Sequence, residues 1–117
     1  MLFRSNGFAS IISDVLDLTE ELRNIEKKCY ELFACRANGN FYFTKGLSNQ
    51  NVSFPEHQDP YPIFIKNIYG KSIWRINGNR LDTGEQKVHF MMPNTPHCVT
   101  SILEPRLSLT IGVYQDV

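Results

Sequence analysis

After Asn40 the sequence breaks into short β-rich runs separated by turn residues, and this pattern limits the fold more than any other feature of the chain. Several runs alternate apolar and polar residues, which places successive side chains on opposite faces of a sheet. Turn residues such as Gly70-Lys71 and Asn77-Gly78-Asn79 separate the runs. Many short strands with regularly spaced turns predict a mainly β sandwich or barrel. The predicted strands cover residues 41–45, 52–54, 63–69, 72–76, 87–92, 98–103 and 107–114.

One amphipathic helix is predicted ahead of these strands, over residues 17–33. Apolar residues recur there in steps of three and four, which marks one face of a helix. Asp17 or Thr19 is the expected N-cap, and the turn residues 37–40 are expected to end the helix. We expect it to pack against one outer face of the sheet. The sequence thus predicts a single domain, 1–117, in which a helical segment (1–39) precedes a barrel (40–117).

The amino-acid composition limits the classes of binding partner and the cellular compartment that we expect. Twelve Lys and Arg residues balance twelve Asp and Glu residues among 117, and a net charge near zero argues against nucleic acid as the main partner. No apolar run approaches the roughly 20 residues of a membrane helix. The first residues do not have the pattern of a signal peptide. Three cysteines without metal-binding spacing fit reduced thiols. We therefore predict a cytoplasmic protein with no nucleic-acid or membrane partner.

The segment that points to chemistry is His57-Gln58-Asp59. Residues two apart on an extended strand point to the same face, so His57 and Asp59 can present an imidazole and a carboxylate to one point inside a barrel. His97 follows after about three predicted strands, and a barrel can return it beside the first pair. Two imidazoles and one carboxylate on one face leave the opposite coordination positions open, an arrangement typical of non-haem Fe(II) oxygenases. The alternative is that both histidines have only structural roles.

Three blocks of the sequence, in this order and spacing, resemble the JmjC/cupin-like 2-oxoglutarate oxygenases. The block 57–75 combines H-x-D, a short apolar strand, and a Gly followed by a basic residue and a Trp. The second block joins L-D-T-G-E (81–85) to M-P-N-T-P-H (92–97), and the third is the final strand, 105–113. The resemblance covers residues 40–115. It implies a double-stranded β-helix, the cupin or jelly-roll barrel.

The resemblance also implies a ligand set and a co-substrate. His57, Asp59 and His97 would bind Fe(II) or another divalent metal, and 2-oxoglutarate would be the co-substrate. The family holds the far carboxylate of 2-oxoglutarate with a cation or with hydroxyl donors. The lysine that usually does this lies two residues after the Gly, where this chain has Ser72. Lys71 would face the site only if a bulge occurs at Gly70-Lys71.

Other residues are candidates for the same carboxylate. Lys66 shares a strand face with Phe64, and the sequence leaves open which face of this strand points inward. Arg106 precedes Leu107-Ser108 near the start of the last strand, and arginine binds carboxylates in a bidentate manner. Its alternative is a structural arginine at the edge of a strand. The remaining candidates are Thr44, Tyr42 and Asn67.

The resemblance implies an oxygenase that hydroxylates a peptide side chain or a small metabolite. Two alternatives stay open. One is a cupin metalloenzyme that does not use 2-oxoglutarate, which Ser72 in place of the lysine favours. The other is a non-catalytic cupin binding module, which the small size favours. The expected partners are a small molecule or a peptide, and a homodimer is left open.

Overall fold

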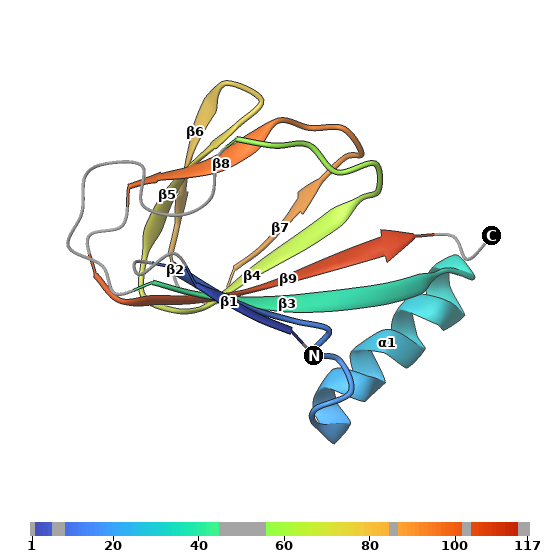
Figure 1. The fold of residues 1–117 in the computed structure, drawn as a ribbon. Coiled ribbons are helices and arrows are strands. Elements are labelled where there is room, and N and C mark those ends of the chain that lie inside the picture. Colours follow the sequence, from blue (N-terminus) through green and yellow to red (C-terminus); the bar gives the residue numbers. More distant parts are fainter. Residues whose placement is uncertain (1, 6–8, 45–55, 85–86, 102–103, 115–117) are drawn as a thin grey trace.

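The computed structural model describes residues 2–5, 9–44, 56–84, 87–101 and 104–114. Two antiparallel β-sheets and one α-helix make up this part of the chain (Figure 1). The predicted mainly β fold with one helix is confirmed. The predicted strand 52–54 lies outside the described residues.

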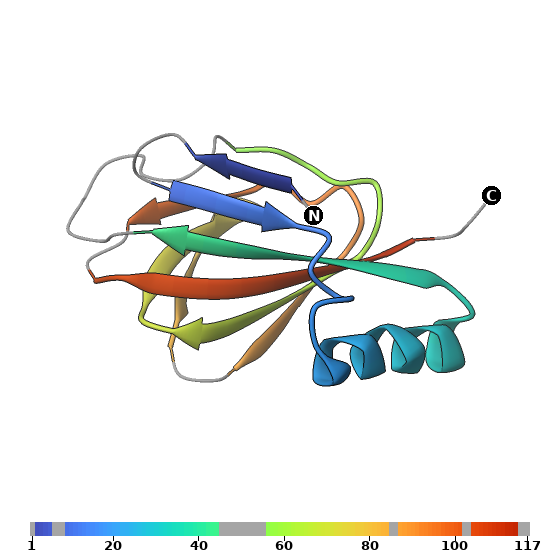
Figure 2. The same ribbon diagram turned by 60° about the horizontal axis from the view of Figure 1, so that its bottom comes forward.

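The larger sheet has six strands in the order β1-β2-β3-β9-β4-β7, which Figure 2 shows lying side by side. The smaller sheet has three strands in the order β6-β5-β8 and faces the larger one (Figure 1). The strands of the larger sheet are β1 (Leu2–Ser5), β2 (Ala9–Ser13), β3 (Arg36–Thr44), β9 (Arg106–Tyr114), β4 (Ile63–Tyr69) and β7 (Val88–Met91). Those of the smaller sheet are β6 (Asn79–Thr83), β5 (Ser72–Ile76) and β8 (His97–Ser101).

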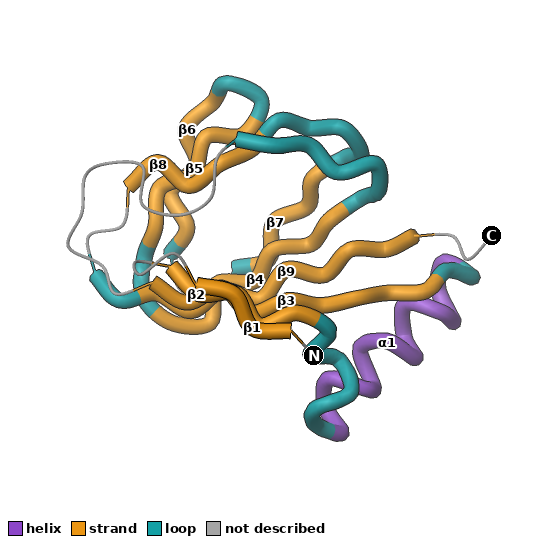
Figure 3. The backbone as a smooth tube through the Cα atoms, viewed as in Figure 1, coloured by secondary structure: helices purple, strands orange, loops and turns teal. Residues whose placement is uncertain are grey.

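Two separate apolar clusters hold these layers together. One fills the space between the two sheets and consists of Ile63, Ile65, Trp74, Met91 and Val99. The other lies between the larger sheet and helix α1 (Glu20–Phe33) and consists of Leu16, Cys29, Ala37 and Val113. The helix therefore packs on the outer face of the larger sheet, as predicted, on the side away from the smaller sheet (Figure 3).

The helix α1 begins as its sequence predicts. Thr19, rather than Asp17, is the N-cap, and its side chain accepts a hydrogen bond from the Leu22 N–H at 3.1 Å. Glu20 and Glu21 lie in the first turn, where they interact favourably with the helix dipole. Within the described residues, no helix has the length and apolar character needed to cross a membrane.

The helix ends at Phe33, as predicted, but the turn predicted at 37–40 is wrong. The C-cap is Ala34, which adopts a left-handed conformation with φ of 53° and donates its N–H to the Tyr30 carbonyl. Residues 37–40 then belong to β3 instead of forming a turn. Their alternation explains this: the small Ala37 and Gly39 are buried on the outer face, while Asn38 and Asn40 line the cavity. A Cβ at position 39 would lie 2.7 Å from the Leu16 Cδ2 atom, so this glycine provides close packing.

The predicted helical character of residues 1–39 is also wrong in part. Strands β1 and β2 precede the helix, and β2 pairs with β3 from Ala9↔Thr44 to Ser13↔Asn40. Strand β6 was likewise not predicted. Its residues are mostly polar and exposed, and it forms because the Asn77-Gly78 turn, with φ of 50° and 80°, returns the chain antiparallel to β5.

The pairing of β3 with β9 determines which side chains lie on the inner face of the larger sheet. It runs without interruption from Arg36↔Tyr114 to Thr44↔Arg106. Strand β4 pairs with the other edge of β9, and the register shifts between Asn67 and Tyr69. A bulge at Gly70-Lys71 would turn Lys71 toward the site, but the observed register shift lies earlier in the chain. On β4, Ile63, Ile65 and Asn67 are buried and face the smaller sheet, whereas Lys66 is exposed.

Candidate metal centre

Backbone pairing places His57 beside His97. The His57 N–H donates to the His97 carbonyl at 3.1 Å, and the His97 N–H donates to the His57 carbonyl at 3.0 Å. The imidazole centroids lie 4.3 Å apart. A third backbone bond, from the Asn94 N–H to the Asp59 carbonyl at 2.7 Å, ties the segment after His57 to the turn before His97. Two segments that are distant in the sequence thus form one unit.

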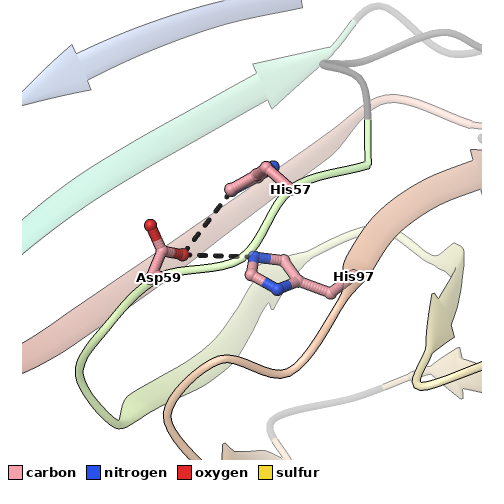
Figure 4. A group of neighbouring side chains, drawn as sticks. All are labelled: His57, Asp59 and His97. Atoms are coloured by element: carbon pink, nitrogen blue, oxygen red, sulfur yellow. Dashed lines mark ion pairs between the residues drawn. The ribbon is translucent and has the colours of Figure 1, made fainter.

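Asp59 lies between the two imidazoles (Figure 4). Its Oδ2 atom is 3.6 Å from the His57 Nε2 atom and 3.4 Å from the His97 Nε2 atom. One potential ligand atom from each of the three residues lies within 4.8 Å of the others. Adjacent ligands of an octahedral ion at ~2.1 Å are about 3 Å apart, so the group fits a divalent metal after a small movement of its side chains. The three predicted ligands are therefore brought together by the fold.

The tautomer of His97 suits this role. Its Nδ1 atom is 2.8 Å from the Thr95 carbonyl oxygen, which can only accept, so Nδ1 carries the proton and Nε2 presents a lone pair toward Asp59. Burial lowers the pKa of His97, and the nearby His57 adds to this, against the opposite effect of the Thr95 hydrogen bond. The imidazole is consequently neutral at neutral pH, as a metal ligand must be.

The group lies at the wall of a cavity of about 270 Å³ between the two sheets. His97 is buried, while the side chain of His57 is 45% exposed, so the candidate centre lies where the interior meets the opening. The cavity contains both polar and apolar walls. The described residues that line it are Asn38, Asn40, Tyr42, His57, Asp59, Tyr61, Ile63, Trp74, Met91, His97, Cys98, Val99, Arg106, Thr110, Gly112 and Tyr114.

Arg106 lines the same cavity and is fully buried. Its Nε–H donates to the Thr44 hydroxyl at 3.3 Å, and its guanidinium donates to the Ser108 hydroxyl at 3.4 Å. Burial lowers the pKa of Arg106 to about 10. A buried guanidinium that faces a cavity is a suitable partner for an anionic group of a ligand.

Among the other candidates for co-substrate binding, Tyr42 also lines the cavity. Lys66 and Lys71 are exposed and do not line it. Ser72 is buried and bonded to Thr83, and Asn67 donates to the Gly70 carbonyl and accepts a bond from Ser108. Thr44 contributes indirectly, through its bond to Arg106. Of the seven residues predicted for this role, Arg106 and Tyr42 line the cavity.

Several cavity residues were not predicted from the sequence. Asn38, Asn40 and Thr110 lie on paired positions of β3 and β9, where Asn40 is opposite Thr110. The alternation of polar residues in 36–44 is the available signal, but the turn residues 37–40 by themselves predict a turn there. Tyr61 packs its ring over Gly112, where a Cβ would lie 2.5 Å from the Tyr61 Cε2 atom. Burial and the nearby Asp59 carboxylate raise the pKa of Tyr61.

No model of a known protein family matches this chain, and no curated protein matches it in sequence. Solved structures do match in fold. The ribosomal oxygenase YcfD from Escherichia coli aligns with a TM-score of 0.74 and 16% identity, over 93% of this chain and 32% of that chain. The same protein has been solved in complex with cobalt and succinic acid.

Two further structures widen the comparison. The plu4264 protein from Photorhabdus luminescens aligns with a TM-score of 0.63 and 13% identity, over 98% of this chain and 81% of that chain. The DMSP lyase DddQ from Ruegeria pomeroyi DSS-3 aligns with a TM-score of 0.55 and 18% identity, over 66% of this chain and 38% of that chain. This chain spans about a third of the YcfD chain and of the lyase chain. At these identities the similarity establishes a shared fold, a cupin-like β-sandwich that oxygenases and lyases both use.

Proposed function

We propose that the described chain forms a double-stranded β-helix of the cupin superfamily and is an Fe(II)- and 2-oxoglutarate-dependent oxygenase. One observation carries the proposal: two imidazoles and one carboxylate converge at the wall of a cavity that a buried arginine also lines. The two imidazoles and the carboxylate are the ligand set of non-haem Fe(II) oxygenases. The buried arginine supplies the cation that a dicarboxylate co-substrate needs. The fold shared with YcfD supports the same conclusion.

His57, Asp59 and His97 would hold the metal, with their Nε2 and carboxylate oxygen atoms as ligands. When bound, Fe(II) would supply the redox chemistry that couples decarboxylation of 2-oxoglutarate to oxidation of a substrate. Thr95 keeps His97 in the required tautomer through its carbonyl oxygen. The backbone bonds between His57 and His97 keep the two ligands together before any metal binds.

Arg106 would bind the far carboxylate of 2-oxoglutarate. Its burial makes a charge-assisted hydrogen bond stronger than the same bond in water, because the surroundings have a low dielectric constant. Thr44 and Ser108 orient the guanidinium by hydrogen bonds. This role for Arg106 removes the need for the lysine that Ser72 replaces.

The size of the cavity limits what can enter beside the co-substrate. Its volume is about 270 Å³. A small diacid would occupy much of this space. Ile63, Met91 and Val99 form apolar walls that exclude water from the remainder. We therefore propose that a substrate reaches the centre with one small group, such as the side chain of a peptide or one end of a metabolite.

Ligand binding tests this proposal directly. Protein freed of metal by a chelator should gain stability when Fe(II) is added without oxygen, and gain more with 2-oxoglutarate, by about 2.7 kcal/mol at a concentration of 100 times the dissociation constant. When O2 is then admitted together with a substrate, or with ascorbate as reductant, the protein should also convert 2-oxoglutarate and O2 to succinate and CO2. His57→Ala and Asp59→Ala should abolish both effects, whereas His89→Gln, a histidine outside the cluster, should abolish neither. If neither ligand shifts the melting temperature of the wild-type protein, the proposal is wrong.

A metalloenzyme of the same fold that does not use 2-oxoglutarate is the second candidate. The observation that favours it is Ser72, which bonds to Thr83 and Trp74 where the oxygenase pattern has a lysine. The DMSP lyases show that a protein with this fold can be a lyase. Stabilisation by metal alone, with no response to 2-oxoglutarate and no succinate, would favour this candidate over the first.

A further inference from the structure

Trp74 contacts both ends of the proposed co-substrate site. Its indole ring stacks on the His97 imidazole with centroids 6.4 Å apart and an angle of 27° between the planes. The Arg106 Cζ atom lies over the same indole, 6.0 Å from the ring centroid. Trp74 is buried and lines the cavity. One rigid side chain thus joins a candidate metal ligand on β8 to a buried cation on β9.

A chain of buried hydrogen bonds holds this indole in place. The Trp74 Nε1–H donates to the Ser72 hydroxyl at 2.9 Å. The Ser72 hydroxyl in turn lies 2.8 Å from the Thr83 hydroxyl, which donates to the Ser72 carbonyl at 2.9 Å. Since the Thr83 proton is used in that bond, the Ser72 hydroxyl donates to Thr83 and accepts from Trp74. Every donor in the chain is satisfied, so the indole has one preferred orientation.

We propose that Trp74 is a positioning residue that fixes the separation between the metal centre and Arg106, and so selects the length of the 2-oxo diacid that the site binds. The inference rests on the proposed function. A cation over an indole face is attracted to the ring, which restrains an otherwise flexible arginine. Stacking also restrains the plane of the His97 imidazole. A diacid held at both ends binds well only if its length matches that separation.

The test compares three diacids on the metal-loaded protein. Titration calorimetry with Mn(II) present gives dissociation constants for 2-oxoglutarate, for the shorter oxaloacetate and for the longer 2-oxoadipate. The variants are Trp74→Phe, which removes the indole N–H and shrinks the ring, and Ser72→Ala, which keeps the ring and removes its hydrogen-bond partner. Phe90→Leu is the matched control, because Phe90 is an exposed aromatic residue that does not line the cavity.

The wild-type protein and Phe90→Leu should prefer 2-oxoglutarate. Trp74→Phe should weaken binding of 2-oxoglutarate about tenfold and reduce the preference over the other two diacids. Ser72→Ala should act in the same direction while leaving Mn(II) affinity nearly unchanged. Folded variants that keep the wild-type preference would overturn the inference alone. A wild-type protein that binds Mn(II) but none of the three diacids would overturn the proposed function as well.

Fluorescence of the wild-type protein gives a test that needs no variant. Trp74 is the single tryptophan of the chain, so all tryptophan emission reports on this position. Co(II) should quench the emission, and 2-oxoglutarate should then change it further, because Arg106 and His97 both contact the ring. Emission that does not respond to saturating 2-oxoglutarate would contradict the role of Trp74.

Discussion

The backbones of His57 and His97 exchange two hydrogen bonds, of 3.1 and 3.0 Å, while their side chains meet at Asp59. Main-chain atoms therefore hold the two segments together, while the imidazoles face the Asp59 carboxylate. This separation of roles predicts that a mutation can remove a metal ligand without unfolding the protein.

His57→Ala should remove metal binding and leave the fold intact. The His57 side chain is 45% exposed, and its backbone bonds do not depend on the imidazole. The free energy of unfolding of the metal-free protein should change by less than about 1 kcal/mol. The affinity for Co(II), measured by calorimetry, should fall at least about 100-fold. A variant that binds Co(II) as the wild type does would exclude His57 as a ligand.

The metal-free protein should lose stability as the pH falls below the ordinary pKa of histidine. Burial lowers the pKa of His97 in the folded state below the ordinary histidine value of 6.5. The unfolded chain therefore binds a proton first, and the free energy of unfolding decreases as the pH drops from about 7 through 6.5 toward the lowered folded-state pKa. Chemical denaturation at a series of pH values, with a chelator present, measures this slope. His97→Gln should reduce it, and His89→Gln should not.

Arg106→Met should abolish the response to 2-oxoglutarate at little cost in stability. Burial lowers the pKa of Arg106 to about 10, so holding the charge in the interior costs roughly 3 kcal/mol. Removing that cost offsets the lost hydrogen bonds to Thr44 and Ser108, which are worth about 1–3 kcal/mol. The free energy of unfolding should thus change by less than about 2 kcal/mol. Arg80→Met, at an exposed arginine, is the matched control.

Loss of both stability and ligand response in Arg106→Met would have a different meaning. It would show that Arg106 is needed for the inner faces of β3, β9 and β4 to pack, and the arginine would then be a structural residue. Calorimetry with 2-oxoglutarate on the folded fraction separates the two results.

Gly112→Ala should disturb the cavity through Tyr61. A Cβ at position 112 would lie 2.5 Å from the Tyr61 ring, which packs over the β9 backbone there. The ring must move, at a cost of about 1–3 kcal/mol in the free energy of unfolding. Gly84→Ala is the matched control, because among the described residues beyond its chain neighbours no atom lies within 4 Å of a Cβ at position 84. Urea denaturation of both variants measures the difference, and equal stabilities would contradict this packing.

Local pattern was sufficient for the parts of the fold that depend on local chemistry. The alternation in 63–69 and 72–76 predicted β4 and β5 with their observed bounds, and the Asn77-Gly78 turn occurs where its residues favour it. The helix was predicted because Thr19 and the apolar face that includes Cys29 are features of its own sequence. The ligand group was predicted from the H-x-D spacing, the later His97 and the resemblance of the surrounding blocks.

Local pattern was not sufficient where a strand depends on its neighbours. Residues 37–40 have turn chemistry, yet they extend because Leu16 packs over Gly39 and because β3 pairs with β9 along its whole length. Strand β6 exists because β5 lies beside it. Pairing with a neighbouring strand outweighed local propensity in both places, at long sequence separation for β3 and within a hairpin for β6.

The sequence by itself determined the residue types of the candidate centre, the parity that puts His57 and Asp59 on one side, and the mainly β character of the chain. Only the tertiary structure decided that His97 returns to meet them, that Arg106 rather than Lys66, Lys71 or Ser72 faces the cavity, and that Trp74 contacts both. The physical reason is that these choices depend on which inner faces the two sheets bring together. That outcome follows from pairing between strands that are distant in the sequence, which no local spacing encodes.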